Sequence, residues 1–161
     1  MTRIPALLTI EPETAADAAA VEAVVLDAFG PGRFAKTAER LREGSAPFAG
    51  FVARDGDRVI GSVRLWPVDV AGRRAAFLGP IAVEDAFRES GVGARLVEAA
   101  TEAARTVGVE GVLLIGTPWF ARFGFAPAPQ VAFPGPADPH RIWWLPLADA
   151  APPAGPVTVR A

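Results

Sequence analysis

Residues 75–115 have the pattern of a strand, a helix and a second strand, and this unit constrains the fold more than any other part of the sequence. An apolar segment at 75–83 leads to an alanine-rich segment at 91–107, whose apolar residues recur at the spacing of one helix face. Gly108 ends the predicted helix, and the continuously apolar segment 111–115 is typical of a strand buried on both faces. Two strands joined by a helix are expected to lie parallel and adjacent in one sheet.

The predicted helix at 91–107 has one polar and one apolar face. Its charged residues fall on the polar face. The apolar face is expected to be buried and consists of Leu96, Val97, Ala100, Ala103, Ala104 and Val107.

Two more helices are predicted nearer the N-terminus. Thr14 is the expected N-cap of the first, because a threonine oxygen can accept from an N–H of the first turn. Apolar residues then recur at helical spacing as far as Phe29, and the Gly-Pro-Gly sequence at 30–32 ends the element. A second, shorter helix is expected at about 35–43.

The remaining predicted elements are strands and one short helix. Turn sequences at 55–57 and 71–73 would join three consecutive strands into an antiparallel meander. The strands of the N-terminal half are predicted at 7–10, where Glu11-Pro12 interrupts the strand, at 48–54, at 58–66 and at 75–83. After a short helix at 119–123, frequent prolines leave room only for brief strands near Val131, at 142–147 and at 157–160.

Composition favours one compact domain over residues 1–161, whose C-terminal part at 127–161 is rich in proline and aromatic residues. The chain has 161 residues, of which 51% are hydrophobic, enough to bury a core without disulfides. A net charge of −2 with no long block of one sign argues against nucleic-acid and membrane-surface partners. With no cysteine and one histidine, His140, the chain lacks the ligands that zinc prefers, so no metal is expected.

The N-terminal sequence indicates no export signal, because its apolar stretch is too short for one. Elsewhere no apolar run approaches the roughly 18 residues that span a bilayer. The absence of cysteine is compatible with a reducing compartment. A cytoplasmic location is therefore expected.

The sequence Arg88-x-x-Gly91-x-Gly93 stands where the predicted helix begins. A helix start presents unpaired N–H groups and a partial positive charge, and glycine lets a phosphate approach the main chain closely. The spacing is neither the dinucleotide-binding fingerprint nor a P-loop. The segment is therefore either an anion site or an ordinary glycine-containing turn.

Several motifs follow one another at set separations: Leu78-Gly79-Pro80-Ile81-Ala82-Val83 with Arg88-x-x-Gly91-x-Gly93, then Val112-Leu113-Leu114-Ile115-Gly116, then Trp119-Phe120-Ala121-Arg122-Phe123-Gly124-Phe125. Together, in their order and separation, they resemble the GCN5-related N-acetyltransferase (GNAT) superfamily. The resemblance covers about residues 7–126 in element order and is sharpest at 77–125. Within the superfamily, the phrases are similar to a bacterial group of predicted N-acetyltransferases.

The resemblance implies an α/β (α+β) fold with a mixed, mostly antiparallel central sheet, helices on both faces, and a wedge where strands four and five splay apart. Gly79-Pro80 fits a bulge at that place, because proline cannot donate to a strand ladder. Acetyl-CoA, as cosubstrate, would enter the wedge. The main chain of Ile81, Ala82 and Val83 would bond its pantetheine. The backbone N–H groups of Arg88, Glu89, Ser90, Gly91, Val92, Gly93 and Ala94 would hold its diphosphate.

The sequence departs from the family pattern at two places. The family loop usually carries a glycine and a basic residue where Glu89 and Ser90 stand here, so a carboxylate lies near the expected diphosphate. Weaker cofactor binding is expected, with Arg88 or Arg95 as compensation. Phe120 occupies the place where many members have the tyrosine that protonates the departing thiolate, and the chain has no tyrosine.

No residue is assigned as catalytic base. Glu84, Asp85 and Asp69 are near the expected site, but an acidic residue at such positions is more often a solvated turn residue. The acceptor would be an amine of a small molecule or peptide, and the protein a monomer or homodimer. The resemblance places its pocket at 29–34 and at Phe133, Trp143 and Trp144, whose rings either contact an apolar acceptor or fill a small core.

Three functions remain open on sequence alone. The first is an acetyl-CoA-dependent N-acyltransferase. The second is a module that binds or senses acyl-CoA without turnover, which the residues Glu89 and Phe120 would favour. The third is a structural or interaction domain on the same fold, which would not explain why Gly91 and Gly93 stand at the start of the helix.

Overall fold

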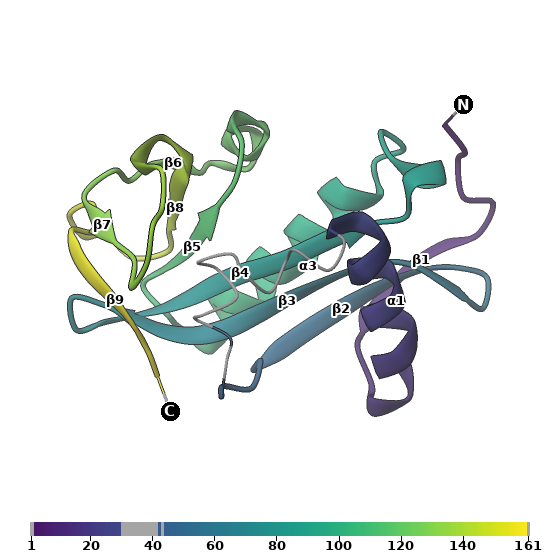
Figure 1. Ribbon diagram of the computed structural model, residues 1–161, viewed down its shortest axis with the longest axis horizontal. Coiled ribbons are helices and arrows are strands. Elements are labelled where there is room, and N and C mark those ends of the chain that lie inside the picture. The colour runs from purple at the N-terminus through teal and green to yellow at the C-terminus, as the bar shows by residue number, and fades with distance from the viewer. Residues whose placement is uncertain (1, 30–41, 43, 161) are drawn as a thin grey trace.

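The computed structural model describes residues 2–29, 42 and 44–160, and these form one extended sheet with helices on its two faces (Figure 1). The strands follow the spatial order β1-β2-β3-β4-β5-β8-β6, with β7 and β9 joined to the sheet through β3. The strands are β1 (Leu8–Pro12), β2 (Ala49–Asp55), β3 (Arg58–Val70), β4 (Arg73–Val83), β5 (Gly111–Ile115), β6 (Ala126–Pro127), β7 (Val131–Ala132), β8 (Ile142–Pro146) and β9 (Gly155–Val159). The helices are α1 (Ala18–Phe29) and α3 (Val92–Val107), with 3-10 turns η1 (Ala15–Asp17), η3 (Asp85–Phe87), η4 (Pro118–Phe123) and η5 (Pro139–Arg141).

The predicted meander is confirmed, since β2, β3 and β4 pair antiparallel in sequence order. Tight turns join them, at Gly56 and Asp57 and at Ala71 and Gly72. Both residues of the second turn have positive φ, 49° at Ala71 and 84° at Gly72, as a hairpin of this kind requires.

Two strands continue through a proline beyond their predicted ends, and β4 begins at Arg73, two residues before its predicted start. β1 continues through Glu11 to Pro12, which pairs with Phe51. β1 is an edge strand, so a missing N–H can face away from the ladder without loss. β3 continues past Trp66 through Pro67, whose carbonyl accepts a hydrogen bond from the N–H of Arg160 at 3.1 Å.

The two long helices cover opposite faces of the sheet, as predicted. In Figure 1, α1 crosses in front of the strands and α3 runs behind them. Neighbouring residues of β2 show why: Val52 packs with Val21 and Val25 of α1, whereas Ala53 belongs to the cluster around α3.

The buried face of α3 agrees with the prediction except at its end. The residues from Leu96 to Ala104 on this face are fully or partly buried, but Val107 is 51% exposed. Sequence periodicity predicts which side of a helix a side chain lies on. It does not predict how far along the helix the sheet covers that side, and Val107 is the last residue of α3. The helix predicted at 35–43 and the turn at 30–32 lie outside the described residues.

The C-terminal part continues the sheet beyond β5. β8 pairs antiparallel with β5 over five residues, and β9 pairs with the end of β3 at residues 68–70. Gly111 is required here, because a Cβ at this position would overlap the Trp144 ring. The brief strands predicted near Val131, at 142–147 and at 157–160 are therefore present, with ends shifted by up to two residues.

Candidate functional site

A bulge in β4 opens the sheet where the sequence predicted it. Leu78 lies opposite Leu65, and Ile81 lies opposite Val63. Between these two pairs β4 contains one residue more than β3, and the bulge lies at Gly79 and Pro80. The Gly79–Pro80 peptide is cis. The indole N–H of buried Trp66 donates to the Gly79 carbonyl at 2.6 Å. This hydrogen bond, which sequence analysis missed, fixes the bulge from the neighbouring strand.

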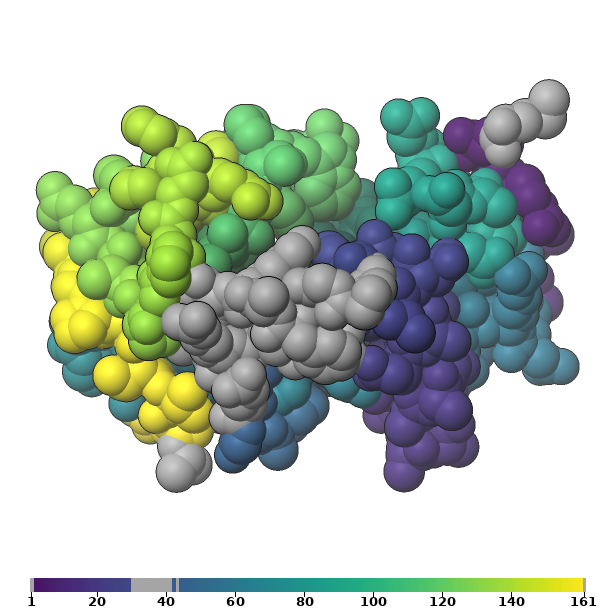
Figure 2. Space-filling model, viewed as in Figure 1, coloured from purple at the N-terminus to yellow at the C-terminus, as the bar shows by residue number. Residues whose placement is uncertain are grey.

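Beyond the bulge, β4 and β5 separate. The two strands are parallel, as predicted, but pair only at Ala76 with Val112 and Phe77 with Leu113. Figure 2 shows a notch in the upper outline, between the green part of the chain that follows β5 and the teal part that precedes α3. The splayed wedge is thus a property of this fold.

Main-chain groups of β4 face the wedge at alternate residues. The N–H of Glu84 donates to the Ile60 carbonyl of β3 at 2.8 Å. In an antiparallel ladder the direction of these groups alternates along a strand, so Ala82 also faces β3. Ile81 and Val83 consequently direct their N–H and C=O groups toward the gap, whereas the side chain of Ala82 is buried under α1.

The segment between β4 and α3 presents a row of unbonded N–H groups. Ser90 donates its hydroxyl to the Phe87 carbonyl, and the Arg88 N–H donates to the Asp85 carbonyl at 3.2 Å. From Glu89 to Ala94, no backbone N–H has a protein acceptor within the described part of the chain, and no side chain caps α3. The positive end of a 16-residue helix therefore opens toward the mouth of the wedge.

Backbone conformation explains two residues of this segment. Gly91 has φ 92° and nothing within 4 Å of where a Cβ would be, so conformation and not packing requires glycine there. Glu89 has φ 61°, a left-handed conformation that side chains disfavour. A glycine, which the resemblance implies as the usual residue at position 89, would adopt this conformation without strain, and Glu89 lacks that advantage.

The other wall of the gap follows β5 and is aromatic. Phe120 is 8% exposed, and its ring packs edge-on against Trp119 and Phe125, with centroids 4.9 and 6.0 Å away. Trp119 reaches the opposite wall, because its ring carbon Cη2 lies 3.7 Å from the place a Cβ of Gly93 would occupy. A Cβ on Gly93 would also lie 3.8 Å from Val83, so these three residues meet at the mouth.

Each acidic residue considered as a base has a cationic partner. Glu84 forms an ion pair with Arg58, and Asp69 forms one with Arg160. Asp85 Oδ1 lies 3.1 Å from Arg88 Nε, with both side chains largely exposed. These ion pairs support leaving the base unassigned, although Asp69 lies in β3 and not in a turn.

The predicted acceptor pocket is only partly described. Residues 30–34 lie outside the described chain. Trp143 and Trp144 are 6% and 5% exposed and belong to the clusters on opposite faces of the sheet, so both rings fill the core. Phe133 packs edge-on against Phe77 of β4, with ring centroids 5.9 Å apart, just before the bulge.

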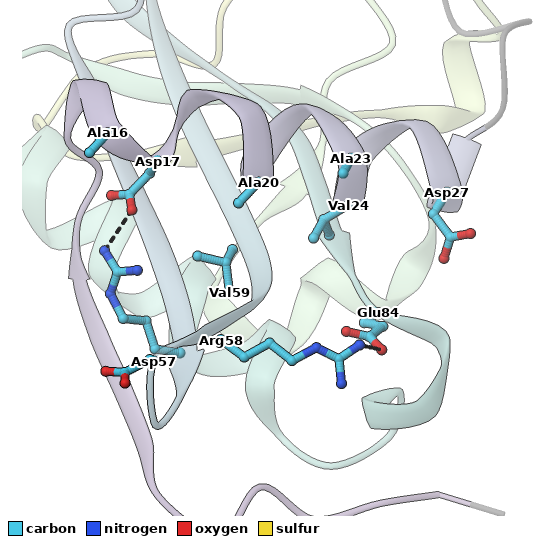
Figure 3. A pocket seen from close by; sticks show the side chains of 11 residues that line it. Ala16, Asp17, Ala20, Ala23, Val24, Asp27, Asp57, Arg58, Val59 and Glu84 are labelled. Carbon is cyan, nitrogen blue, oxygen red and sulfur yellow. Dashed lines mark hydrogen bonds and ion pairs between the residues drawn. The ribbon is translucent and has the colours of Figure 1, made fainter.

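A separate surface groove of about 710 Å³ lies between α1 and the β2–β3 hairpin (Figure 3). Its α1 wall consists of Ala20, Ala23, Val24 and Asp27. Its charged residues include two ion pairs, Asp17 with Arg54 and Arg58 with Glu84. Hydrogen bonds from the Thr14 N–H and then from Arg54 lower the pKa of Asp17. Thr14 and Asp17 thereby cap the start of the helical segment, as predicted for Thr14.

Comparison with known proteins decides which family this fold and wedge represent. Residues 18–125 match the Acetyltransferase (GNAT) family. The chain belongs to this family. It is 33% identical over 122 residues to the uncharacterized N-acetyltransferase YhbS of Escherichia coli, covering 73% of each chain.

Solved structures of GNAT proteins agree over almost the whole chain. YhbS from E. coli in complex with CoA has a TM-score of 0.82 and 29% identity, covering 99% of this chain and 94% of that one. A GNAT family acetyltransferase from Brucella melitensis in complex with acetyl-CoA has a TM-score of 0.74 and 26% identity, covering 96% of both chains. The resemblance inferred from the sequence is confirmed.

The described residues contain neither a cluster of metal ligands nor a membrane-spanning helix. Among them, no three His, Cys, Asp or Glu side chains are grouped so that they could hold a metal ion. Within the same part of the chain, no helix combines the length and apolarity that crossing a membrane requires.

Proposed function

We propose that this protein transfers an acetyl group from acetyl-CoA to an amine of a small molecule or peptide. The carrying observation is the row of unbonded N–H groups from Glu89 to Ala94 beside a gap that strand pairing does not close. GNAT relatives that bind CoA or acetyl-CoA supply the choice of cosubstrate. The diphosphate would accept from these N–H groups, and the pantetheine would lie along β4.

In the proposed reaction, the amine nitrogen attacks the thioester carbonyl and forms the amide bond as the C–S bond breaks. An N–H of Ile81 or Val83 facing the gap would polarise the carbonyl oxygen. The amine loses one proton, and the CoA thiolate takes one up. Positioning and polarisation by the main chain would provide most of the rate.

We propose that Phe120 leaves the enzyme without a side-chain general acid at the tyrosine position. Its ring lies in an apolar cluster and offers no proton. A thiol with a pKa of about 8.5 leaves readily as its anion. The rate lost without a general acid should therefore fall at the low end of the roughly 10²- to 10⁴-fold that such a group contributes. Deprotonating the amine, with a pKa of about 10, is the larger requirement.

Calorimetry and a CoA-release assay test the proposal. Acetyl-CoA and CoA should both bind, and at least one amine in a panel of small amines and N-terminal peptides should release CoA. The rate should rise as pH approaches the pKa of that amine. No heat with either ligand would reject the cofactor site, whereas tight binding without release on any amine would leave the non-catalytic alternative, which the comparisons do not support.

A further inference from the structure

Arg122 of η4 is held in one orientation by Trp119. Its Nε–H donates to the Trp119 carbonyl at 3.0 Å, and its guanidinium carbon lies 5.0 Å from the centroid of the Trp119 ring. Neither contact uses the two terminal nitrogens of Arg122, and these have no protein acceptor within the described chain. The side chain is exposed, so these nitrogens are accessible from solvent.

The position of Trp119 brings this cation to the mouth of the wedge. The indole ring reaches from η4 to Gly93 at the start of α3, and the Arg122 guanidinium lies over the same ring. Arg122 therefore belongs to the wall that follows β5, opposite the wall that carries the free N–H groups of Glu89 to Ala94.

The loop itself supplies little positive charge for a diphosphate. Arg88 pairs with Asp85, and Glu89 adds a negative charge. Arg122 has no carboxylate within ion-pair distance in the part of the chain that the structure describes. A planar guanidinium that is already fixed in place loses little conformational freedom on binding a phosphate and can contact it through two nitrogens.

We propose that Arg122 is the phosphate-binding cation of the cofactor site and contacts the diphosphate of CoA from the wall opposite the helix start. This inference rests on the proposed function, because it requires CoA in the wedge. Sequence analysis suggested Arg88 or Arg95 for this role; Arg88 pairs with Asp85, and Arg95 stays the alternative that the controls below test.

Calorimetry with three ligands tests the assignment on the intact protein. The ligands are CoA, dephospho-CoA, which keeps the diphosphate but lacks the 3′-phosphate, and pantetheine, which has neither. Arg122→Ala should bind CoA and dephospho-CoA at least about tenfold more weakly, since a charge-assisted hydrogen bond is lost. Its affinity for pantetheine should not change, and Arg122→Lys should be intermediate because it keeps the charge but not the planar fork.

Matched controls separate this effect from a general loss of positive charge. Arg105→Ala removes an exposed arginine near the other end of α3 and should bind all three ligands like the wild type. Arg95→Ala tests the alternative cation in the second turn of α3, and a larger loss there than in Arg122→Ala would overturn the assignment. Arg122→Gln, which keeps a polar chain without the charge, replaces Arg122→Ala if thermal melting shows that the alanine variant does not fold.

The other outcomes each decide the inference. A loss for CoA without a loss for dephospho-CoA would move the contact to the 3′-phosphate and overturn the diphosphate assignment. An equal loss for pantetheine, or none for any ligand, would mean that Arg122 only supports Trp119. If the wild type binds neither CoA nor dephospho-CoA, the proposed function itself fails, which differs from failure of Arg122 alone.

Discussion

At the scale of single residues, Glu89 combines an unfavourable conformation with an unfavourable charge. Its φ of 61° disfavours any side chain, and its carboxylate lies in the segment whose N–H groups form the proposed diphosphate site. Gly91, two residues later, has a similar φ of 92° at no steric cost. The residue at position 89 therefore affects both stability and cofactor affinity, by separate routes.

Two substitutions separate these routes. Glu89→Gly should raise the free energy of unfolding by roughly 1 kcal/mol, because glycine adopts this conformation without strain. It should also bind CoA about two- to fivefold more tightly, since the repulsion removed is about 1 kcal/mol or less in solvent. Glu89→Gln should give the gain in affinity without the gain in stability. Urea unfolding and calorimetry measure the two, and an unchanged affinity in Glu89→Gln would place the carboxylate away from the diphosphate.

At the scale of elements, the bulge in β4 determines where the wedge begins. The bulge depends on Gly79 and Pro80 in β4 itself and on Trp66 of β3, whose indole N–H bonds the Gly79 carbonyl. One contact between neighbouring strands thus links the packing of the sheet to the geometry of the site.

Trp66→Phe should therefore affect the site as well as the core. Removing the indole N–H leaves the Gly79 carbonyl without this donor, and an unsatisfied buried group costs about 1–3 kcal/mol. Affinity for acetyl-CoA should fall together with stability. Trp144→Phe is the control. Trp144 is 5% exposed and Trp66 is 7% exposed, but Trp144 lies on β8 and not on a strand next to the bulge in β4. Equal effects of the two substitutions on acetyl-CoA affinity, measured by calorimetry, would contradict a role for Trp66 in shaping the wedge.

The start of α1 is tied to β2 through Asp17, whose stabilising effect should depend on pH. The lowered pKa of Asp17 means that its contribution is complete above the ordinary aspartate pKa of about 3.9 and is lost as pH falls through the folded value. Asp17→Asn should unfold at lower urea than the wild type at pH 7, and the difference should shrink below about pH 4. Asp27→Asn, in α1 and exposed, should show little difference at either pH. A deficit in Asp17→Asn that stays constant as pH falls would rule out the charged carboxylate as its source.

At the scale of the whole molecule, local signals in the sequence predicted the elements, and the contacts between distant elements had to come from the structure. The meander, the strand-helix-strand unit and the bulge at Gly79 and Pro80 follow from turns, periodicity and the missing proline N–H. The pairing of β9 with β3, and the bond from Trp66 to Gly79, depend on register between segments that no short motif records.

The candidate site was predictable to the same degree. Gly91 and Gly93 marked the helix start, and the structure shows that the N–H groups from Glu89 to Ala94 have no acceptor among the described residues. Sequence alone did not show that Ala82 faces β3 while Ile81 and Val83 face the gap, because this depends on which residues follow the bulge in register. It also did not show that Trp119 contacts the opposite wall or that it carries Arg122.

The short pairing of β4 with β5 has a mechanical consequence for the catalytic cycle proposed here. Besides the link through α3, two residue pairs join β4 to β5, and among the described residues the chain that follows β5 pairs again with the antiparallel part of the sheet only where β9 meets residues 68–70 of β3. A cosubstrate bonded to both parts of the sheet would restrict their motion relative to each other while it is bound. Departure of CoA would remove this restraint, so slow motions of the two parts should be largest in the empty protein.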